Sequence, residues 1–421
     1  MKKSNLYKLH LIIYLLLFSS TSVLAQEVNL DFKEIEAKVI DSDTKSPLIF
    51  TDILIKNSNI STVTNSDGEF LLKIPNAFSG GSLILSHLGY KQTEIKIALI
   101  KKHEKIALKP AVTELNQINI TTTTKDARKL VEETLKKKSS IYNDNNTIMT
   151  AFYRETIKKR RKNASISEAV IKIHKQPYNN FRNDNIELIK ARKNTNYSKL
   201  DTVALKLQGG PFSNLYTDII KYPDLIFTSE DIPLYKFSFD NSTSINNRHI
   251  YVINFKQKND DGIPLYFGKL YIDAETLALT NAVFSLNVSN RELSSRMYVR
   301  KKPRKVDVYP TEATYRVNYR TTNGKWHYAY SNISLTFKVN WKGKLFNSTY
   351  TLNSEMAITD WEIYNTKLAK IRSRLIRPST ILNEKASGFS DPRFWGTYNI
   401  IEPEKSIESA IKKIQKQLKR T

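Results

Sequence analysis

The chain has no cysteine among its 421 residues. Disulfide bonds, cysteine-ligated zinc, iron–sulfur clusters and thiol catalysis are therefore excluded. Histidine is also scarce, with 6 residues, which argues against a metal site built from several histidines. After residue 25, no stretch approaches the roughly 20 apolar residues that a membrane-spanning helix needs. We therefore expect no transmembrane span in the mature protein.

Acidic residues are in deficit, since 41 Asp and Glu stand against 66 Lys and Arg, a formal net charge of +25. Such an excess suits nucleic acid, an anionic membrane surface or acidic polymers. With 40% apolar and 25% charged residues, most of the chain can build packed cores, which excludes a disordered protein. At roughly 100–200 residues per domain, the length allows two or three domains.

The first 25 residues have the pattern of a secretory signal peptide. Three lysines lie within residues 1–10, and an apolar run follows from Leu11 to Phe18. Residues 23–25, Val-Leu-Ala, offer small side chains for a cleavage site. We therefore expect residues 1–25 to be removed and the protein to be exported to the periplasm or the outer membrane. An exported protein rarely meets DNA, so the basic surplus is expected to face anionic lipid or glycan, or simply solvent.

Residues 34–110 alternate short β-prone runs with turn residues. Asp67 and Gly68 form an Asp-Gly turn between two such runs, which is a strong hairpin signal, and Phe70 begins the apolar face of the second run. About seven short strands at spacings of about 8–12 residues predict a small β-sandwich. Gly68 is expected to supply a positive φ in the turn, and Gly89 to do the same at a strand end.

These motifs resemble the carboxypeptidase-regulatory-like domain, a prealbumin-type β-sandwich. The resemblance rests on the turn motif and the later Gly-Tyr pair: Asp67, Gly68, Phe70, Gly89 and Tyr90. The segment departs from the commonest form of the module at Phe50-Thr51-Asp52, Lys56-Asn57 and His87. The resemblance implies an exported protein of the kind common in Bacteroidetes. It implies no peptidase chemistry, because carboxypeptidases carry this module as an appendage to the catalytic domain.

Residues 111–146 are predicted to form a helical linker. The apolar spacing predicts a helix over 125–139, with Thr124 as its N-cap. Residues 142–146 are predicted to be a polar connection to the next domain. A second short helix is predicted to begin at Pro211, because proline suits the first helical position.

From 147 to 360, long runs of alternating apolar and polar residues predict a large antiparallel β domain with one face exposed to water. Residues 268–276 have a strand–turn–strand pattern. This short segment resembles part of the strongly curved sheets of lipoprotein-carrier-like half-barrels.

Residues 361–421 form a basic segment followed by an amphipathic helix over 403–418. Five cations stand close together without acidic residues between them: Lys367, Lys370, Arg372, Arg374 and Arg377. They are a candidate patch for an anionic partner, with a solvated surface as the alternative.

No motif for catalysis or metal binding is present in the sequence. None of the histidines has a Glu at zinc-peptidase spacing, and no G-x-S-x-G occurs. The pair Asp260-Asp261 is interpreted as a turn, and Asp41-Ser42-Asp43 lacks the Gly and Glu of a calcium loop. We therefore expect no catalytic residue, no metal ligand and no cofactor.

The sequence thus predicts a mainly β envelope protein, with an N-terminal prealbumin- or Ig-like sandwich and a larger curved antiparallel domain with a few helices. The first hypothesis is a non-catalytic binding or structural adaptor, whose sandwich and large sheet each dock a partner. The alternative is a periplasmic carrier that holds a hydrophobic ligand such as a lipid in a curved sheet. An undetected hydrolase is a second alternative. The expected partners are an envelope protein or an anionic lipid or glycan surface.

Overall fold

The computed structural model describes residues 32–111, 126–160, 162–195, 209–259, 262–299, 302–343, 345, 347–364, 374–388, 393–405 and 407. Strands dominate these ranges, and the predicted mainly β fold is confirmed. The predicted signal peptide lies outside them, as does most of the helix expected over 403–418. None of the helices within the described ranges is both long enough and apolar enough to cross a bilayer.

Two small sheets form the N-terminal sandwich. The first has the order β4-β1-β7, with β1 (Phe32–Asp41), β4 (Glu69–Pro75) and β7 (Glu104–Leu108). The second has the order β3-β2-β5-β6, with β2 (Asp52–Ile55), β3 (Ser61–Val63), β5 (Ser82–Ser86) and β6 (Thr93–Lys96). The 3-10 helix Ile97–Leu99 follows β6 directly, with Ile97 buried in the sandwich core.

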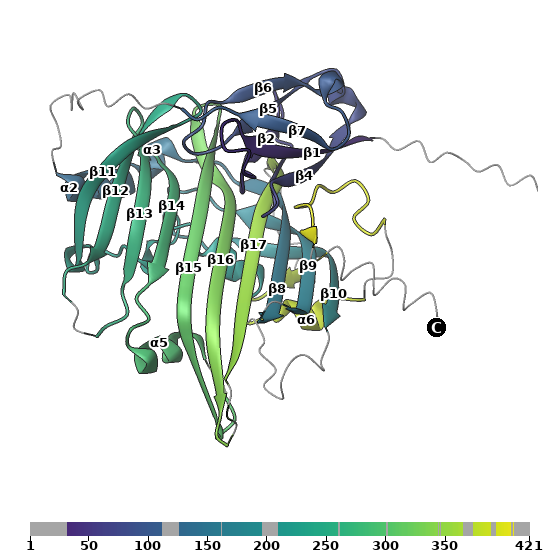
Figure 1. Cartoon of the computed structure of the whole chain (residues 1–421). Helices are drawn as coiled ribbons and strands as arrows, with labels where there is room; N and C mark the ends of the chain where they lie inside the picture. The colour runs from purple at the N-terminus through teal and green to yellow at the C-terminus, as the bar shows by residue number, and fades with distance from the viewer. Residues whose placement is uncertain are drawn as a thin grey trace, which may run out of the picture.

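The rest of the fold is built on one 11-stranded sheet in the order β11-β12-β13-β14-β15-β16-β17-β8-β9-β10-β18. Its strands are β8 (Thr147–Lys159), β9 (Lys162–Lys175), β10 (Asn185–Thr195), β11 (Tyr235–Ile245), β12 (Arg248–Gln257), β13 (Tyr266–Asp273), β14 (Leu279–Leu286), β15 (Val306–Thr322), β16 (Lys325–Trp341), β17 (Ser348–Ile363) and β18 (Leu375–Ile376). All neighbouring strands are antiparallel. The sandwich sits at one end of this sheet, above β15–β17 in Figure 1.

Helices pack on one face of the large sheet, here called the inner face. They are α2 (Ala127–Lys136), α3 (Lys138–Ile141) and α4 (Pro211–Leu215), followed by 3-10 turns at Pro223–Leu225 and Ile232–Leu234. Apolar residues of these helices, such as Leu130 and Leu215, join inner-face residues such as Tyr153 and Ile253 in a single core. Two further helices, α5 (Arg291–Tyr298) and α6 (Leu382–Lys385), lie near β15 and β10.

The opposite, outer face is also covered over part of its area. Phe152 and Val170 of the sheet form a small apolar cluster with Val63 of the sandwich and with Trp395 and Ile401 of the C-terminal segment. The prediction that one face of the large sheet is exposed to water is therefore wrong for this part of the outer face. The alternating sequence pattern could not reveal this, because the covering residues come from both ends of the chain.

Two expectations for the helical linker are also corrected. The N-cap of α2 is Asp126, whose carboxylate accepts the backbone N–H of Arg128 at 2.9 Å, whereas the predicted cap Thr124 lies outside the described residues. Tyr142, predicted to lie in a polar connection, is fully buried. Its hydroxyl donates to the Leu279 carbonyl oxygen at 3.0 Å, and its ring lies 5.0 Å from that of Tyr178.

Candidate functional site

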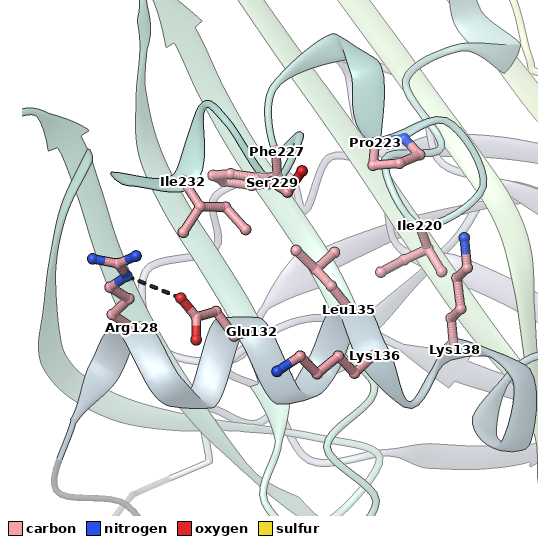
Figure 2. A pocket seen from close by; sticks show the side chains of 10 residues that line it. All are labelled: Arg128, Glu132, Leu135, Lys136, Lys138, Ile220, Pro223, Phe227, Ser229 and Ile232. Atoms are coloured by element: carbon pink, nitrogen blue, oxygen red, sulfur yellow. Dashed lines mark hydrogen bonds and ion pairs between the residues drawn. The ribbon is translucent and has the colours of Figure 1, made fainter. Parts of the chain in front are cut away.

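A cleft of about 410 Å³ opens between α2 and the irregular segment 220–232 on the inner face (Figure 2). Its lining combines apolar with charged side chains: Leu135, Ile220, Pro223, Phe227 and Ile232, then Arg128, Glu132, Lys136 and Lys138, together with Ser229. Three cations therefore stand against one carboxylate at the rim. Small-ligand pockets are generally concave, mainly apolar and about 300–1,000 Å³ in volume, so this cleft is a candidate binding site.

One wall of the cleft is a face of α2. Its buried stripe, which includes Leu130 and Val131, packs on the large core. Arg128, Glu132 and Leu135 are spaced by four and three residues, so they share another face of the helix. The Nε atom of Arg128 lies 2.9 Å from Glu132 Oε1, and Leu135 points from the helix toward the opposite wall in Figure 2.

The opposite wall is held by an aromatic cluster. Phe227 is only 3% exposed, and its ring centroid lies 5.1 Å from Phe255 and 5.7 Å from Tyr235. Ile220 and Ile232 are also buried. The apolar floor is thus part of the packed core, which fixes its shape before any ligand arrives.

A buried ionic cluster ties this wall to the sheet. Lys175, at the end of β9, places its Nζ 2.7 Å from Asp184 and 2.8 Å from Asp218. Asp218 also accepts hydrogen bonds from the hydroxyls of Tyr178 at 2.7 Å and Tyr319 at 2.9 Å. Burial alone would lower the pKa of Lys175, but the two carboxylates raise it, so the ammonium group stays charged. The cluster therefore anchors the segment that carries Ile220.

Two lysines of this region make defined contacts. Lys138 places its Nζ 5.7 Å from the ring centroid of the exposed Phe181. Lys221 donates to the carbonyl oxygens of Pro177 at 2.7 Å and Asn180 at 2.8 Å, and burial lowers its pKa to about 8. With Arg128 and Lys136, Lys138 gives the rim three cations against one carboxylate, which favours a ligand with an anionic group.

The predicted turn motif lies in the sandwich, where its residues have structural roles. Gly68 has φ +74°, and a Cβ atom there would lie 2.7 Å from the Val39 carbonyl oxygen. Phe70 is buried in the sandwich core, and Asp67 Oδ2 accepts the backbone N–H of Lys405 at 3.3 Å. The turn therefore both closes the sandwich and contacts the C-terminal segment.

Gly89 and Tyr90, the Gly-Tyr pair, also have structural roles. Gly89, with φ +83°, donates its backbone N–H to the Ser244 carbonyl oxygen of β11 at 2.8 Å. Tyr90 donates its hydroxyl to Asp41 at 2.5 Å. Burial, together with this carboxylate, raises the pKa of Tyr90 to about 12, and the same hydrogen bond lowers the pKa of Asp41 to about 2.

Most of the predicted basic patch cannot be placed, because Lys367, Lys370 and Arg372 lie outside the described residues. Arg374 is exposed, and its Nη1 lies 3.6 Å from Glu187 of β10, while Arg377 lies just after β18. The strand β18 is one edge of the large sheet, whereas α2 contacts β11 at the other edge. The described part of the patch is therefore separate from the cleft.

Sequence reasoning missed the contact between the sandwich and the large sheet. Arg320 of β15 donates to Asp52 of β2 through Nε at 2.8 Å and to Ser61 of β3 at 2.7 Å. Thr62 donates to the Ile400 carbonyl oxygen at 2.9 Å. One face of the sandwich therefore docks within its own chain. A polar strand such as β3 gave no signal of burial.

Sequence reasoning also missed the cleft, because the apolar spacing that predicts a helix over 125–139 does not show which of its side chains face a gap. In the described ranges, no three His, Asp or Glu side chains come together as metal ligands would.

Comparison with known proteins places the sandwich but not the whole chain. A domain from Vibrio parahaemolyticus described as outer membrane lipoprotein-sorting is similar at 10% identity and a TM-score of 0.26, over 59% of this chain and 96% of that chain. A DUF1329 family protein from Desulfovibrio piger has 10% identity and a TM-score of 0.22, over 58% and 95%. A LolA superfamily protein from Nitrosomonas europaea has 8% identity and a TM-score of 0.18, over 57% and 96%.

No curated protein matches the chain. The family model of the CarboxypepD_reg-like domain, in contrast, matches residues 35–120. This range contains both the Asp-Gly turn and the Gly-Tyr pair from which the resemblance was predicted. Residues 35–120 are therefore identified as a carboxypeptidase-regulatory-like domain.

Proposed function

We propose that this protein binds an anionic amphiphile in the cleft between α2 and residues 220–232, and that it acts as a carrier of that ligand rather than as an enzyme. The observation that carries the proposal is the pairing of a packed apolar floor with a rim of three cations and one carboxylate. An apolar tail would lie against Leu135 and Phe227. Its anionic headgroup would lie near Lys136 and Lys138.

The energetics favour such a ligand. Each methylene group that leaves water contributes about 0.8 kcal/mol, so a short buried chain supplies most of a useful affinity. The lysines at the rim add preference for a negative headgroup and keep it close to solvent, where its desolvation is small. Lys136, one of the lining residues, is exposed to solvent, which gives the ligand a way in.

The lining of the cleft does not favour a hydrolase. Ser229 is its one hydroxyl-bearing residue, and no histidine is among the lining residues to act as its base. The adaptor hypothesis is also weakened, because the sandwich face around β3 already packs on the large sheet. An adaptor would need to use another face of the sandwich.

Titration of the full chain with a fluorescent fatty acid such as cis-parinarate tests the proposal. We expect saturable binding, and Leu135→Gln is expected to weaken it about tenfold, because a half-buried apolar contact with the tail is lost. Leu99→Gln is the matched control, since Leu99 is 65% exposed on the sandwich. Equal affinity of both variants, or no binding by the wild type, would contradict the proposal.

A further inference from the structure

One end of the large sheet gathers several strand ends. Val306 at the start of β15 is in register with Trp341 at the end of β16, and Val339 is in register with Ser348 at the start of β17. Tyr350 of β17 is in register with Lys159 at the end of β8. This end lies at the bottom of Figure 1, beyond α5, whereas the sandwich lies at the top.

Exposed cations concentrate at this end, which we call the basic tip: Arg160, Lys162, Lys302, Arg304, Lys305 and Lys342. The nearest carboxylate on β15 is Asp307, which lies 3.4 Å from Lys302. The backbone N–H of Lys342 donates to the Lys305 carbonyl oxygen at 2.9 Å, so these two cations are held together. The cations come from three separate stretches of chain, and the fold brings them to one surface.

An apolar side chain projects from the same end. Leu345, in the connection between β16 and β17, is 95% exposed. A leucine in water beside several lysines and arginines has no packing role in the monomer. Cations near anionic headgroups and an apolar side chain inserted between them are the features with which peripheral proteins hold a membrane surface.

We propose that the basic tip docks the protein on an anionic phospholipid surface, with Leu345 inserted at the headgroup level and the surrounding cations near the phosphates. This surface is separate from the cleft, so the inference does not depend on the proposed ligand. A soluble acidic polymer would use the cations but would leave Leu345 without a role. The lipid surface accounts for both features.

Co-sedimentation with vesicles tests this inference. The full chain is expected to bind vesicles of phosphatidylglycerol and phosphatidylcholine more tightly than vesicles of phosphatidylcholine alone, and to be released at high salt. Comparing two triple variants that both keep the N-terminal run and its three lysines removes any contribution of that segment. Neutralising Arg304, Lys305 and Lys342 together by glutamine should weaken binding to the anionic vesicles on the order of a hundredfold, or about fivefold per cation.

The matched control neutralises Lys96, Lys101 and Lys105, three exposed lysines of the sandwich, and so removes the same net charge from another surface. We expect this control to bind nearly as the wild type does, and Leu345→Ser to weaken binding several-fold. Equal losses in the two triple variants would overturn the inference. So would equal binding to both vesicle types, or binding to heparin without binding to vesicles.

Discussion

Arg154 and Glu168 face each other in register on β8 and β9, and their Nε and Oε1 atoms lie 2.7 Å apart with both side chains fully buried. The other oxygen of Glu168 accepts from Arg192 at 2.8 Å. Arg154 also donates to the Ile401 carbonyl oxygen at 2.8 Å. Glu168 thus bridges two guanidinium groups, and Arg154 also lies 3.1 Å from Glu355. The network holds the C-terminal segment against the outer face.

Glu168→Gln is expected to lower the free energy of unfolding by about 3–5 kcal/mol, because two buried cations lose their shared partner. Urea unfolding at neutral pH measures this loss. The control is Lys56→Gln, which breaks an ion pair with Glu94 that is almost half exposed and should cost less than about 1 kcal/mol. Similar losses in the free energy of unfolding for the two variants would contradict the conclusion that the buried network holds the C-terminal segment in place.

The same network predicts sensitivity to acid. Burial alone would raise the pKa of Glu168, but Arg154 and Arg192 outweigh burial and lower that pKa. A lowered folded-state pKa gives stability that is present above the unfolded-state pKa and is lost as pH falls through the folded-state pKa. Wild-type stability should therefore fall on acidification below about pH 4.5 more steeply than that of Glu168→Gln.

Glu155, the residue after Arg154 on β8, points to the inner face, and its pKa is shifted in the opposite direction to that of Glu168. Its Oε2 accepts the Tyr153 hydroxyl at 2.9 Å, and burial raises its pKa from 4.5 to about 7. The folded state therefore holds a proton that the unfolded state releases, so this group makes stability decrease as pH rises from 4.5 to about 7. Glu155→Gln should remove a decrease of about 3 kcal/mol across that window.

Urea unfolding at several pH values between 4.5 and 8 checks this prediction for Glu155→Gln. Glu230→Gln supplies the control, since it makes the same substitution at an exposed position. If both variants followed the wild-type profile, the prediction would be contradicted, and water would have to reach Glu155 more readily than its 5% exposure indicates.

Gly68 and Gly324 form a matched pair for the turn motif. Their φ values are +74° and +76°, but a Cβ at Gly68 would lie 2.7 Å from the Val39 carbonyl oxygen, whereas nothing lies within 4 Å at Gly324. Gly324→Ala should cost about 1 kcal/mol from backbone strain alone. Gly68→Ala should cost about 2 kcal/mol more, because the close contact adds to the strain. Thermal unfolding compares them, and equal shifts in Tm would sink this explanation of the turn.

The sequence was informative where the structure depends on local chemistry. The Asp67-Gly68 turn and the strand spacing predicted the sandwich, because turn residues and two-residue alternation act over a few positions. Ser61 shows the limit of such local signals. It is a polar residue on a short strand, yet it is fully buried. Its hydroxyl donates to the Ile358 carbonyl oxygen at 3.0 Å, which satisfies the buried polar group. That partner lies almost 300 residues away in the chain, and no local pattern encodes it.

The cleft could not be predicted from the sequence for a related reason. Leu135 belongs to the apolar side of α2 by spacing, and only the packing of Phe227 on β12 leaves it facing a gap rather than the core. The basic tip depends on strand register in the same way, because Lys305 and Lys342 become neighbours only when β15 pairs with β16. Both surfaces follow from long-range pairing, which sequence periodicity alone does not determine.

The most direct test of the central claim, that an anionic amphiphile binds in the cleft, is calorimetric titration of the full chain with dodecanoate and with dodecanol. The account predicts tighter binding of dodecanoate by the wild type. In a variant that carries Lys136→Gln and Lys138→Gln, dodecanoate should lose on the order of tenfold in affinity, while dodecanol should bind unchanged. Equal affinity of the two ligands for the wild type, or an equal loss for both in the variant, would contradict it.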